Sequence, residues 1–205
     1  MRGPKEKKER ALGVRLGLKG ERAMSPKSSV VRKPYRPGVH GPRSRPKNLS
    51  EFGLQLREKS KFKIAYGVND GNLRRLFANA TVAKGATGAK MLEFLELRLD
   101  SVLFQLGFVP SRGAGRQLVV HGHILVNKKK VRSPGFQLKK GDVISMREGS
   151  MTTGALAKQK EFLKKYDPPS WLRLDAEGLK GEVLSVPTDI NVPFEINLLI
   201  ESFSK

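Results

Sequence analysis

The chain has 205 residues, a formal net charge of +21 and no cysteine. The lack of cysteine excludes disulfides and thiolate metal sites, and three histidines do not make a metal site of their own, so we expect no metal and no cofactor. There is no apolar run of about 18 residues or more, as a membrane span needs, and the first residues lack the apolar core of a secretory signal. A basic, cysteine-free chain fits the reducing cytoplasm and predicts an anionic partner, which is a nucleic acid, an anionic membrane or an acidic protein.

Residues 1–48 carry much of the positive charge. The first 50 residues contain 15 Lys and Arg against 3 Asp and Glu, a net charge of +12. Proline and glycine are frequent in 32–48, so we predict an extended basic arm without a core, in which only 7–18 can form a short helix. Such an arm is either a disordered, solvated tail or a segment ordered by contact with a partner. Four apolar residues favour the second interpretation: Leu12, Val14, Leu16 and Tyr35.

The first of three predicted amphipathic helices covers 49–67. Ser50 is its predicted N-cap, and Gly67 can end it. The spacing of its apolar residues predicts a buried face with Phe52, Leu56 and Ile64. Its polar face carries four candidate RNA-binding cations: Arg57, Lys59, Lys61 and Lys63.

Two more helices are predicted before residue 108. The segment 69–80 is a shorter helix with an inward face of Leu73, Leu76 and Phe77. The segment 89–107 has the strongest helical pattern and is predicted to form one continuous helix ending at Gly107, with Asp100 as a surface charge. Its apolar stripe contains Leu92, Leu95, Leu99, Val102, Leu103 and Leu106.

A helix followed by a small antiparallel sheet is predicted after Pro110. Ser111 caps a helix that ends at Gly122, and strands follow in "HILVN", "KKKVR", "FQL" and "VISM". A further helix is expected at 155–166, and further strands in "WLRL" and "GEVLSVP". The segment "EINLLIESF" is compatible with either a strand or a helix.

Arg112 and Arg116 are four residues apart, which places them on one helix face. The free N–H groups of the helix N-terminus and two guanidinium groups together suit phosphate oxygens. Leu118, Val119 and Val120 are predicted to pack on the opposite side. Gly113 and Gly115 allow a close backbone approach, which a polymeric ligand could use.

The corner after this helix is a second candidate for RNA binding. His121 and His123 either cap the helix end or contact phosphates and bases. Lys128, Lys129 and Lys130 lie at a predicted hairpin tip, where lysines are often only solvated. The convergence of helix cap, arginines, histidines and lysines in one small module is what favours an RNA interface.

Segments 98–131 and 139–148 resemble the S-four RNA-binding domain: "RLDSVLFQLGFVPSRGAGRQLVVHGHILVNKKKV" and "KKGDVISMRE". The resemblance extends to the S-four family of small-subunit ribosomal proteins through "RPGVHGPRSRPKNLSEFGLQLREKSK" and the C-terminal "PFEINLLIESFSK". It implies an α+β fold with an extended basic N-terminal arm (1–48), a helical domain (49–90, completed by about 181–205), and an S-four domain with its extension (91–180), in which two helices pack on a small antiparallel sheet.

The resemblance also implies a function and its partners. It implies direct binding to the 5′ domain of 16S rRNA, nucleation of subunit assembly, contact with ribosomal proteins S-five and S-three, and a place at the mRNA entry channel with an influence on accuracy. Arg43, Arg45 and Lys47 stand where the family has its basic mRNA-entry residues. The full set of expected RNA-binding residues is Arg43, Arg45, Lys47, Arg57, Lys59, Lys61, Lys63, Arg112, Arg116, Gln117, His121, His123, Lys128, Lys129 and Lys130.

This sequence departs from the family pattern at two places of structural interest. Many family members bind zinc through a cysteine cluster in the arm, and this chain has no cysteine. The arm must then be held by proline, packing and RNA alone. Lys128 stands where the family has glycine, and lysine is unfavourable at positive φ, so we do not expect a regular type I′ turn at Asn127-Lys128.

Two other functions are alternatives to that of a structural rRNA-binding protein. Pseudouridine synthases combine an S-four domain with an Asp in an "RLD" sequence, and "RLD" occurs here at 98–100 and 173–175. The first lies inside a predicted helix, and too few residues follow the second for a catalytic domain. A free S-four RNA chaperone would not need the arm or the helices of 50–90.

Overall fold

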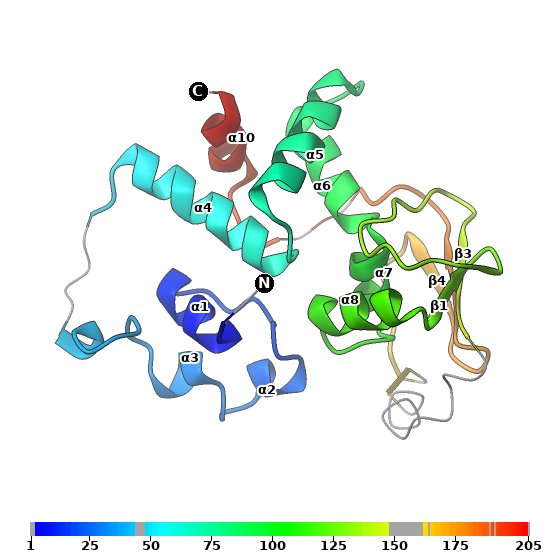
Figure 1. The fold of residues 1–205 in the computed structure, drawn as a ribbon, viewed down its shortest axis with the longest axis horizontal. Helices are drawn as coiled ribbons and strands as arrows, with labels where there is room; N and C mark the ends of the chain where they lie inside the picture. Colours follow the sequence, from blue (N-terminus) through cyan, green and yellow to red (C-terminus); the bar gives the residue numbers. More distant parts are fainter. Residues whose placement is uncertain are drawn as a thin grey trace. The chain divides into compact units, whose positions relative to one another are not determined.

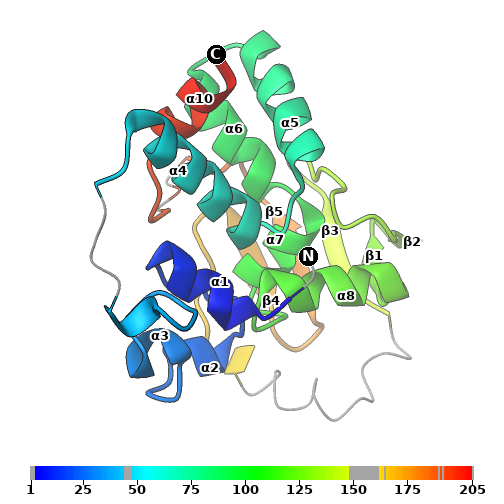
Figure 2. The same ribbon diagram turned by 60° about the vertical axis from the view of Figure 1, so that its left-hand side comes forward.

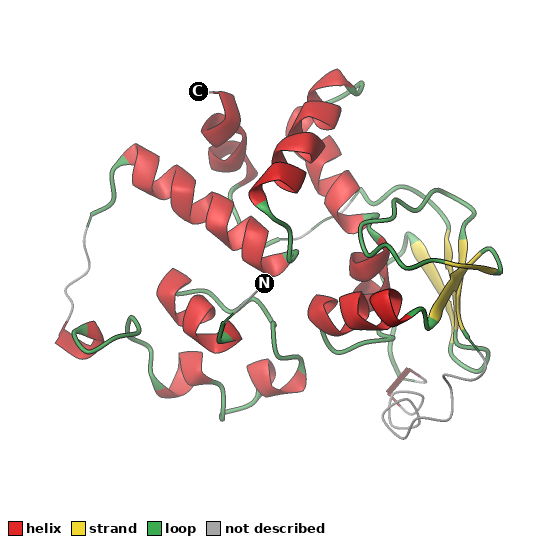
Figure 3. Ribbon diagram, in the orientation of Figure 1, coloured by secondary structure: helices red, strands yellow, loops and turns green. Residues whose placement is uncertain are grey.

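A computed structural model describes residues 3–43, 48–147, 162–163, 165–188, 190 and 192–204. The chain divides into two compact units, one of Met1–Met91 with Asn191–Lys205 and one of Leu92–Ile190 (Figures 1 and 3). Each unit contains regular structure that the sequence predicts from caps and periodicity.

The N-terminal segment forms more regular structure than its composition predicts. It contains three short helices and a 3-10 turn: α1 (Lys5–Leu12), α2 (Glu21–Met24), α3 (Ser29–Arg32) and η1 (Gly41–Arg43). Glu9 is 1% exposed, and its Oε1 accepts hydrogen bonds from the backbone N–H groups of Leu16 and Leu18 at 3.0 and 3.2 Å. Arg10 donates to the backbone oxygens of Lys33 and Tyr35. Side chains of α1 thus hold this segment in addition to proline and packing.

The helices of the first unit lie against the C-terminal helix. They are α4 (Glu51–Ala65), α5 (Asp70–Val82) and the start of α6 (Thr87–Glu96), with α10 (Ile196–Ser204) packed on α4 (Figure 2). The Ser50 cap is confirmed, because its hydroxyl accepts from Gly53 N at 3.3 Å. The segment "EINLLIESF" is therefore helical over most of its length rather than a strand.

The predicted inward face of α4 is wrong. Phe52 and Leu56 are 68% and 52% exposed, whereas the residues that α4 buries are Gln55, Glu58, Phe62 and Ala65. The buried face is set by the C-terminal segment: Gln55 Nε2 donates to Glu201 Oε2 at 3.1 Å, and the Glu58 carboxylate accepts from Glu195 N at 3.3 Å. These polar contacts are made across 146 and 137 residues, so helical periodicity does not reveal them.

The long helix predicted for 89–107 is two helices, α6 and α7 (Leu99–Gln105), so the prediction of one helix is wrong. The break occurs because a distant loop supplies backbone partners. Leu138 N donates to Leu97 O at 2.9 Å, and Leu99 N donates to Phe136 O at 2.9 Å. Gly107, with a φ of 74°, follows α7 as predicted.

The second unit contains a five-stranded antiparallel sheet in the order β2-β1-β3-β5-β4. Its strands are β1 (Ile124–Val126), β2 (Lys129–Lys130), β3 (Val143–Met146), β4 (Leu172–Asp175) and β5 (Lys180–Val183). The strand predicted in "FQL" is reduced to one bridge between Gln137 and Arg98. The helix predicted at 155–166 lies largely outside the described residues.

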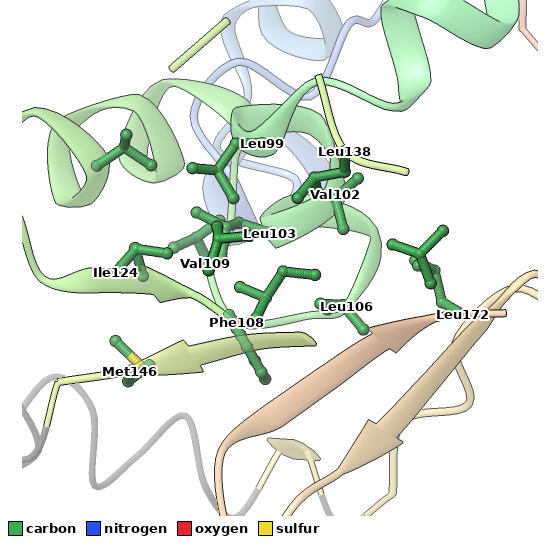
Figure 4. Packing of buried hydrophobic residues seen from close by; sticks show 14 of the residues in the cluster. Leu99, Val102, Leu103, Leu106, Phe108, Val109, Ile124, Leu138, Met146 and Leu172 are labelled. Carbon is green, nitrogen blue, oxygen red and sulfur yellow. The ribbon is translucent and has the colours of Figure 1, made fainter. Parts of the chain in front are cut away.

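The core of this unit lies between the sheet and the helices α7 and α8 (Arg112–His121) (Figure 4). Leu103 of α7 and Leu106, which follows this helix, are fully buried together with Ile124 and Ile144 of the strands. The α+β class, with two helices packed on a small antiparallel sheet, is confirmed. Val120, predicted to pack, is 52% exposed, and Leu118 is only partly buried.

The hairpin between β1 and β2 has a regular two-residue turn, contrary to expectation. Asn127 and Lys128 have φ of 50° and 65°, and Val126 pairs with Lys129 directly across the turn. Positive φ at both central residues defines type I′. The turn accommodates Lys128 because the Asn127 side chain is fixed by bonds to the 139–143 segment, where its Oδ1 accepts from Val143 N at 2.9 Å.

Candidate nucleic-acid interface

The start of α8 is capped as predicted, but its first arginine is engaged by the protein itself. Ser111 Oγ accepts from Ala114 N at 3.3 Å. Arg112 Nη2 donates to Glu96 Oε1 at 2.8 Å and its Nε to Ser101 Oγ at 3.2 Å, and the guanidinium lies 4.9 Å from the centre of the Phe104 ring. The Arg112 side chain is only 17% exposed. Its hydrogen-bonding groups serve the junction of α6, α7 and α8, so the expectation that this side chain is exposed is wrong.

Arg116 and Gln117, one turn further along α8, are exposed. The charge of Arg116 reaches the buried Asp100 carboxyl, where it acts to lower the pKa of that group. Arg112 and Arg116, which the sequence spacing places on one helix face, therefore have different roles. Arg112 joins helices, and Arg116 keeps a surface position at which phosphate contact is possible.

Asp100 belongs to a buried ion pair rather than to the surface, so that prediction is wrong. Arg98 donates to both carboxylate oxygens of Asp100, at 3.0 and 2.7 Å, and the two side chains are 6% and 2% exposed. Burial raises the pKa of the Asp100 carboxyl above its ordinary 3.8, against the hydrogen bond and charge of Arg98, which lower it. The ion pair thus lies where α6 ends and α7 begins.

Gly115 allows α8 to approach the backbone of α7 closely, and it is not exposed to a polymeric ligand. A Cβ built at this buried glycine would lie 3.0 Å from the backbone oxygen of Asp100 and 3.3 Å from Val109 Cγ2. The glycine thus lets α8 pack directly on the backbone of α7, which corrects the interpretation from sequence.

The corner between α8 and β1 gathers cationic and imidazole side chains. The rings of His121 and His123 have centroids 6.2 Å apart, on either side of Gly122, which has a φ of 73°. A Cβ at Gly122 would lie 3.0 Å from Lys130 Nζ and 3.4 Å from Arg132 Nε, so both side chains lie over this glycine. Arg132 was not among the expected residues, although it stands only two residues after Lys130, just beyond the end of β2.

Lys128 and Lys129 are exposed at the hairpin tip, as expected. Neither makes an ion pair or a side-chain hydrogen bond with the part of the chain that the structure describes. They are available to a partner.

The four cations of α4 are in a different situation, because each has a partner within the protein. Arg57 Nη2 donates to Leu12 O at 2.6 Å, and Lys61 pairs with the buried Glu58. Lys63 Nζ lies 3.1 Å from Asp70 Oδ1 and Lys59 Nζ 3.7 Å from the same atom. Lys59 Nζ also lies 4.1 Å from the centre of the Phe203 ring. All four are half-buried.

The remaining predicted residues belong to the N-terminal segment. Arg43 is exposed at the end of η1. Arg45 and Lys47 lie outside the described residues. Over the described ranges, no group of three or more His, Cys, Asp or Glu side chains is placed to hold a metal ion. No described helix combines the length and apolar character that crossing a membrane requires.

Comparison with known families now identifies the class of protein. The family described as "Ribosomal protein S4/S9 N-terminal domain" matches residues 1–96, and the "S4 domain" family matches residues 97–144. The capped α8, the histidine corner and the lysine hairpin lie within the second match. The fold and this site therefore define an RNA-binding protein of the S4-domain class, the module expected from the sequence.

Relatives of nearly the same length make the identification specific. The chain is 44% identical to small ribosomal subunit protein uS4 of Acetivibrio thermocellus over 94% of this chain and 93% of that protein. It is 43% identical to the protein of the same name from Caldicellulosiruptor bescii over 99% and 98%, and 42% identical to that from Thermus thermophilus over 94% and 93%. The chain belongs to the small ribosomal subunit protein uS4 family.

Proposed function

We propose that this protein is a structural component of the small ribosomal subunit that binds rRNA directly. The observation that carries the proposal is similarity to proteins named for that subunit over 94–99% of the chain. The net charge of +21 supports it, because packing against phosphates neutralises such a charge.

The finer proposal is that the chain binds the 5′ domain of 16S rRNA and nucleates subunit assembly. It contacts ribosomal proteins S-five and S-three, and it helps line the mRNA entry channel, where it influences translational accuracy. Arg43, Arg45 and Lys47 are the residues proposed for mRNA. Exposed Arg116, Gln117, His121, Lys128, Lys129 and Lys130, together with half-buried His123, are proposed for rRNA. The proposed functional divisions are the arm (1–48), the helical domain (49–90 with about 181–205) and the S4 domain with its extension (91–180), although β5 and the residues up to 190 lie in the second compact unit.

The structure offers no support for the pseudouridine synthase alternative. Asp100 of the first "RLD" is 1% exposed and held by Arg98, so a substrate cannot reach its carboxylate. Asp175 of the second "RLD" accepts from the backbone N–H groups of Glu177 and Gly178 at 3.2 and 3.0 Å, which fixes the β4–β5 turn. Both carboxylates are used by the fold.

The first unit argues against the alternative of a free RNA chaperone. Residues 1–96 match a ribosomal family of their own. An S4 domain acting alone would have no use for a C-terminal helix that returns to pack on α4.

Co-sedimentation and binding to defined rRNA fragments test the proposal together. We expect the protein to co-sediment with small subunits in moderately high salt and to bind a transcript of the 16S 5′ domain more tightly than one of the 3′ domain. Equal affinity for both transcripts would contradict the specific proposal. Absence from small subunits would contradict a structural role.

A further inference from the structure

Two turns at one end of the sheet are joined by the side chains of Asn127 and Asp142. Asn127 Nδ2 donates to Asp142 Oδ1 at 2.8 Å, and Val143 N donates to Asn127 Oδ1 at 2.9 Å. Asn127 N donates to Val143 O at 2.8 Å. The second carboxylate oxygen of Asp142 accepts from Lys139 N at 2.7 Å. One amide and one carboxylate thus fix the β1–β2 turn against the 139–142 turn that precedes β3.

Each of these turns presents two exposed lysines, namely Lys128 and Lys129 on the first and Lys139 and Lys140 on the second. Within the described part of the chain, none of the four makes an ion pair, a side-chain hydrogen bond or another electrostatic contact. Asp142 is the opposing charge between them, and both its oxygens accept hydrogen bonds from the turns. The joined turns therefore combine four cations with one anion.

We propose that these two turns form a single RNA-backbone-binding surface, to which Lys139 and Lys140 contribute and in which Asn127 is the positioning residue. The proposal rests on the rRNA binding proposed above and extends it to a second turn. Lysine ammonium groups on flexible stems act as point charges, which suits phosphates and reads no base sequence. Gly141, with a φ of 87° and open space where a Cβ would lie, leaves room for a ligand between the lysines and the carboxylate.

The chemistry of the surface favours RNA over a protein or a membrane. Residues 127–128 and 139–142 contain no apolar side chain. Protein interfaces depend on buried aromatic, aliphatic or arginine anchors and are depleted in lysine. Stable membrane attachment needs apolar insertion in addition to charge. A phosphate backbone needs only positioned cations.

Three variants test the proposal in filter binding of the 16S 5′-domain transcript at several KCl concentrations. Lys139→Ala removes one proposed contact, and Lys84→Ala is the matched control, because Lys84 is an exposed lysine in the first unit. Asn127→Gly keeps every lysine and tolerates positive φ, but it removes the side-chain bonds that join the turns. Thermal melts of each variant establish that it is folded.

We expect Lys139→Ala to lower the log–log salt slope by roughly one unit and Lys84→Ala to leave it unchanged. Asn127→Gly should weaken binding without any change in net charge, and Lys139→Ala should have a smaller effect in that background. If the unaltered chain binds the transcript but Lys139→Ala behaves like Lys84→Ala, the second turn is not part of the interface. If Asn127→Gly binds normally, the coupling of the turns is refuted. Failure of the unaltered chain to bind would refute the proposed function and this extension with it.

Discussion

The cations of α4 and the lysines of the sheet turns differ in what the fold leaves for a partner. Arg57, Lys59, Lys61 and Lys63 of α4 are half-buried, and each contacts an acceptor or an aromatic ring of the protein. The turn lysines are exposed, and their turns are fixed through backbone groups and through Asn127 and Asp142. Both regions look equally basic in the sequence. The number of charges therefore indicates an RNA-binding protein, whereas the partners of each cation within the fold indicate where its binding surface lies.

The arginines of the second unit extend the comparison. Arg98 and Arg112 are held by Asp100 and Glu96, whose side chains are each 2% exposed. We therefore assign the buried and half-buried cations mainly to stability and the exposed turn lysines mainly to binding.

The largest effect is expected for Arg98→Ala. The substitution leaves the Asp100 carboxylate buried without its main partner, which should lower the free energy of unfolding by about 3–5 kcal/mol. Chemical denaturation of the variant and the unaltered chain measures it. A loss under about 1 kcal/mol would show that the pair is not a structural element. Arg98→Met combined with Asp100→Leu should recover much of the loss, because no charge is then left buried.

Arg112→Ala should lower the free energy of unfolding by about 1–3 kcal/mol, because the Glu96 carboxylate loses its charged donor. At a temperature where the variant is folded, the log–log slope of its rRNA affinity against salt concentration should be unchanged. The matched control is Arg116→Ala, an exposed position on the same helix, which should cost under about 0.5 kcal/mol while lowering the slope by roughly one unit. If Arg112→Ala lowered the salt slope and Arg116→Ala lowered the free energy of unfolding, the roles given to these two arginines would be wrong.

Lys129→Ala is expected to affect binding alone. The side chain is exposed at the hairpin tip, so the free energy of unfolding should change by less than about 0.5 kcal/mol. The salt slope should fall by roughly one unit. Denaturation and filter binding on the same preparation check both numbers. A marked loss of stability with normal binding would place Lys129 among the structural cations.

The smallest effect concerns Asp70, whose pKa is lowered first by the hydrogen bond from Lys63, and also by the charges of Lys59 and Arg74, against its desolvation. Lys63→Ala should raise this pKa toward 3.8, as followed by NMR titration of the carboxyl carbon. Because the folded pKa is depressed, the Asp70 contribution to stability is present above the unfolded pKa and lost as pH falls through the folded value. The Asp70 side chain is 43% exposed, so we expect only a few tenths of a kcal/mol. No change in the Asp70 pKa would show that Lys63 is not paired in solution.

Local signals in the sequence predicted much of the fold. Ser50 and Ser111 cap their helices, and Gly107 and Gly122 end theirs, because each of these interactions lies within a few residues of chain. The break between α6 and α7 was not predictable, since the helical pattern runs through it and the competing backbone partners come from 134–138. The buried face of α4 was mispredicted for a similar reason, because α10 lies far along the chain.

The candidate site was predicted in outline and not in detail. The exposed hairpin lysines follow from a local turn, whereas the role of Arg112 depends on Glu96 and Ser101, which are brought to it by packing. Spacing places Arg112 and Arg116 on one face but does not tell which of them meets a carboxylate. Arg132, Lys139 and Lys140 were not among the expected RNA-binding residues, because their relation to the corner and hairpin exists only after the sheet has formed.

Lysine acetylation followed by mass spectrometry tests the division between cations most directly. The protein is treated with a limiting amount of reagent, alone and bound to the 16S 5′-domain transcript, and each lysine is quantified. We predict that Lys59, Lys61 and Lys63 react slowly in both states, whereas Lys128, Lys129, Lys139 and Lys140 react rapidly in the free protein and are protected by RNA. Rapid reaction and RNA protection of the α4 lysines, with no protection of the turn lysines, would show that the binding cations lie on α4 and not on the turns.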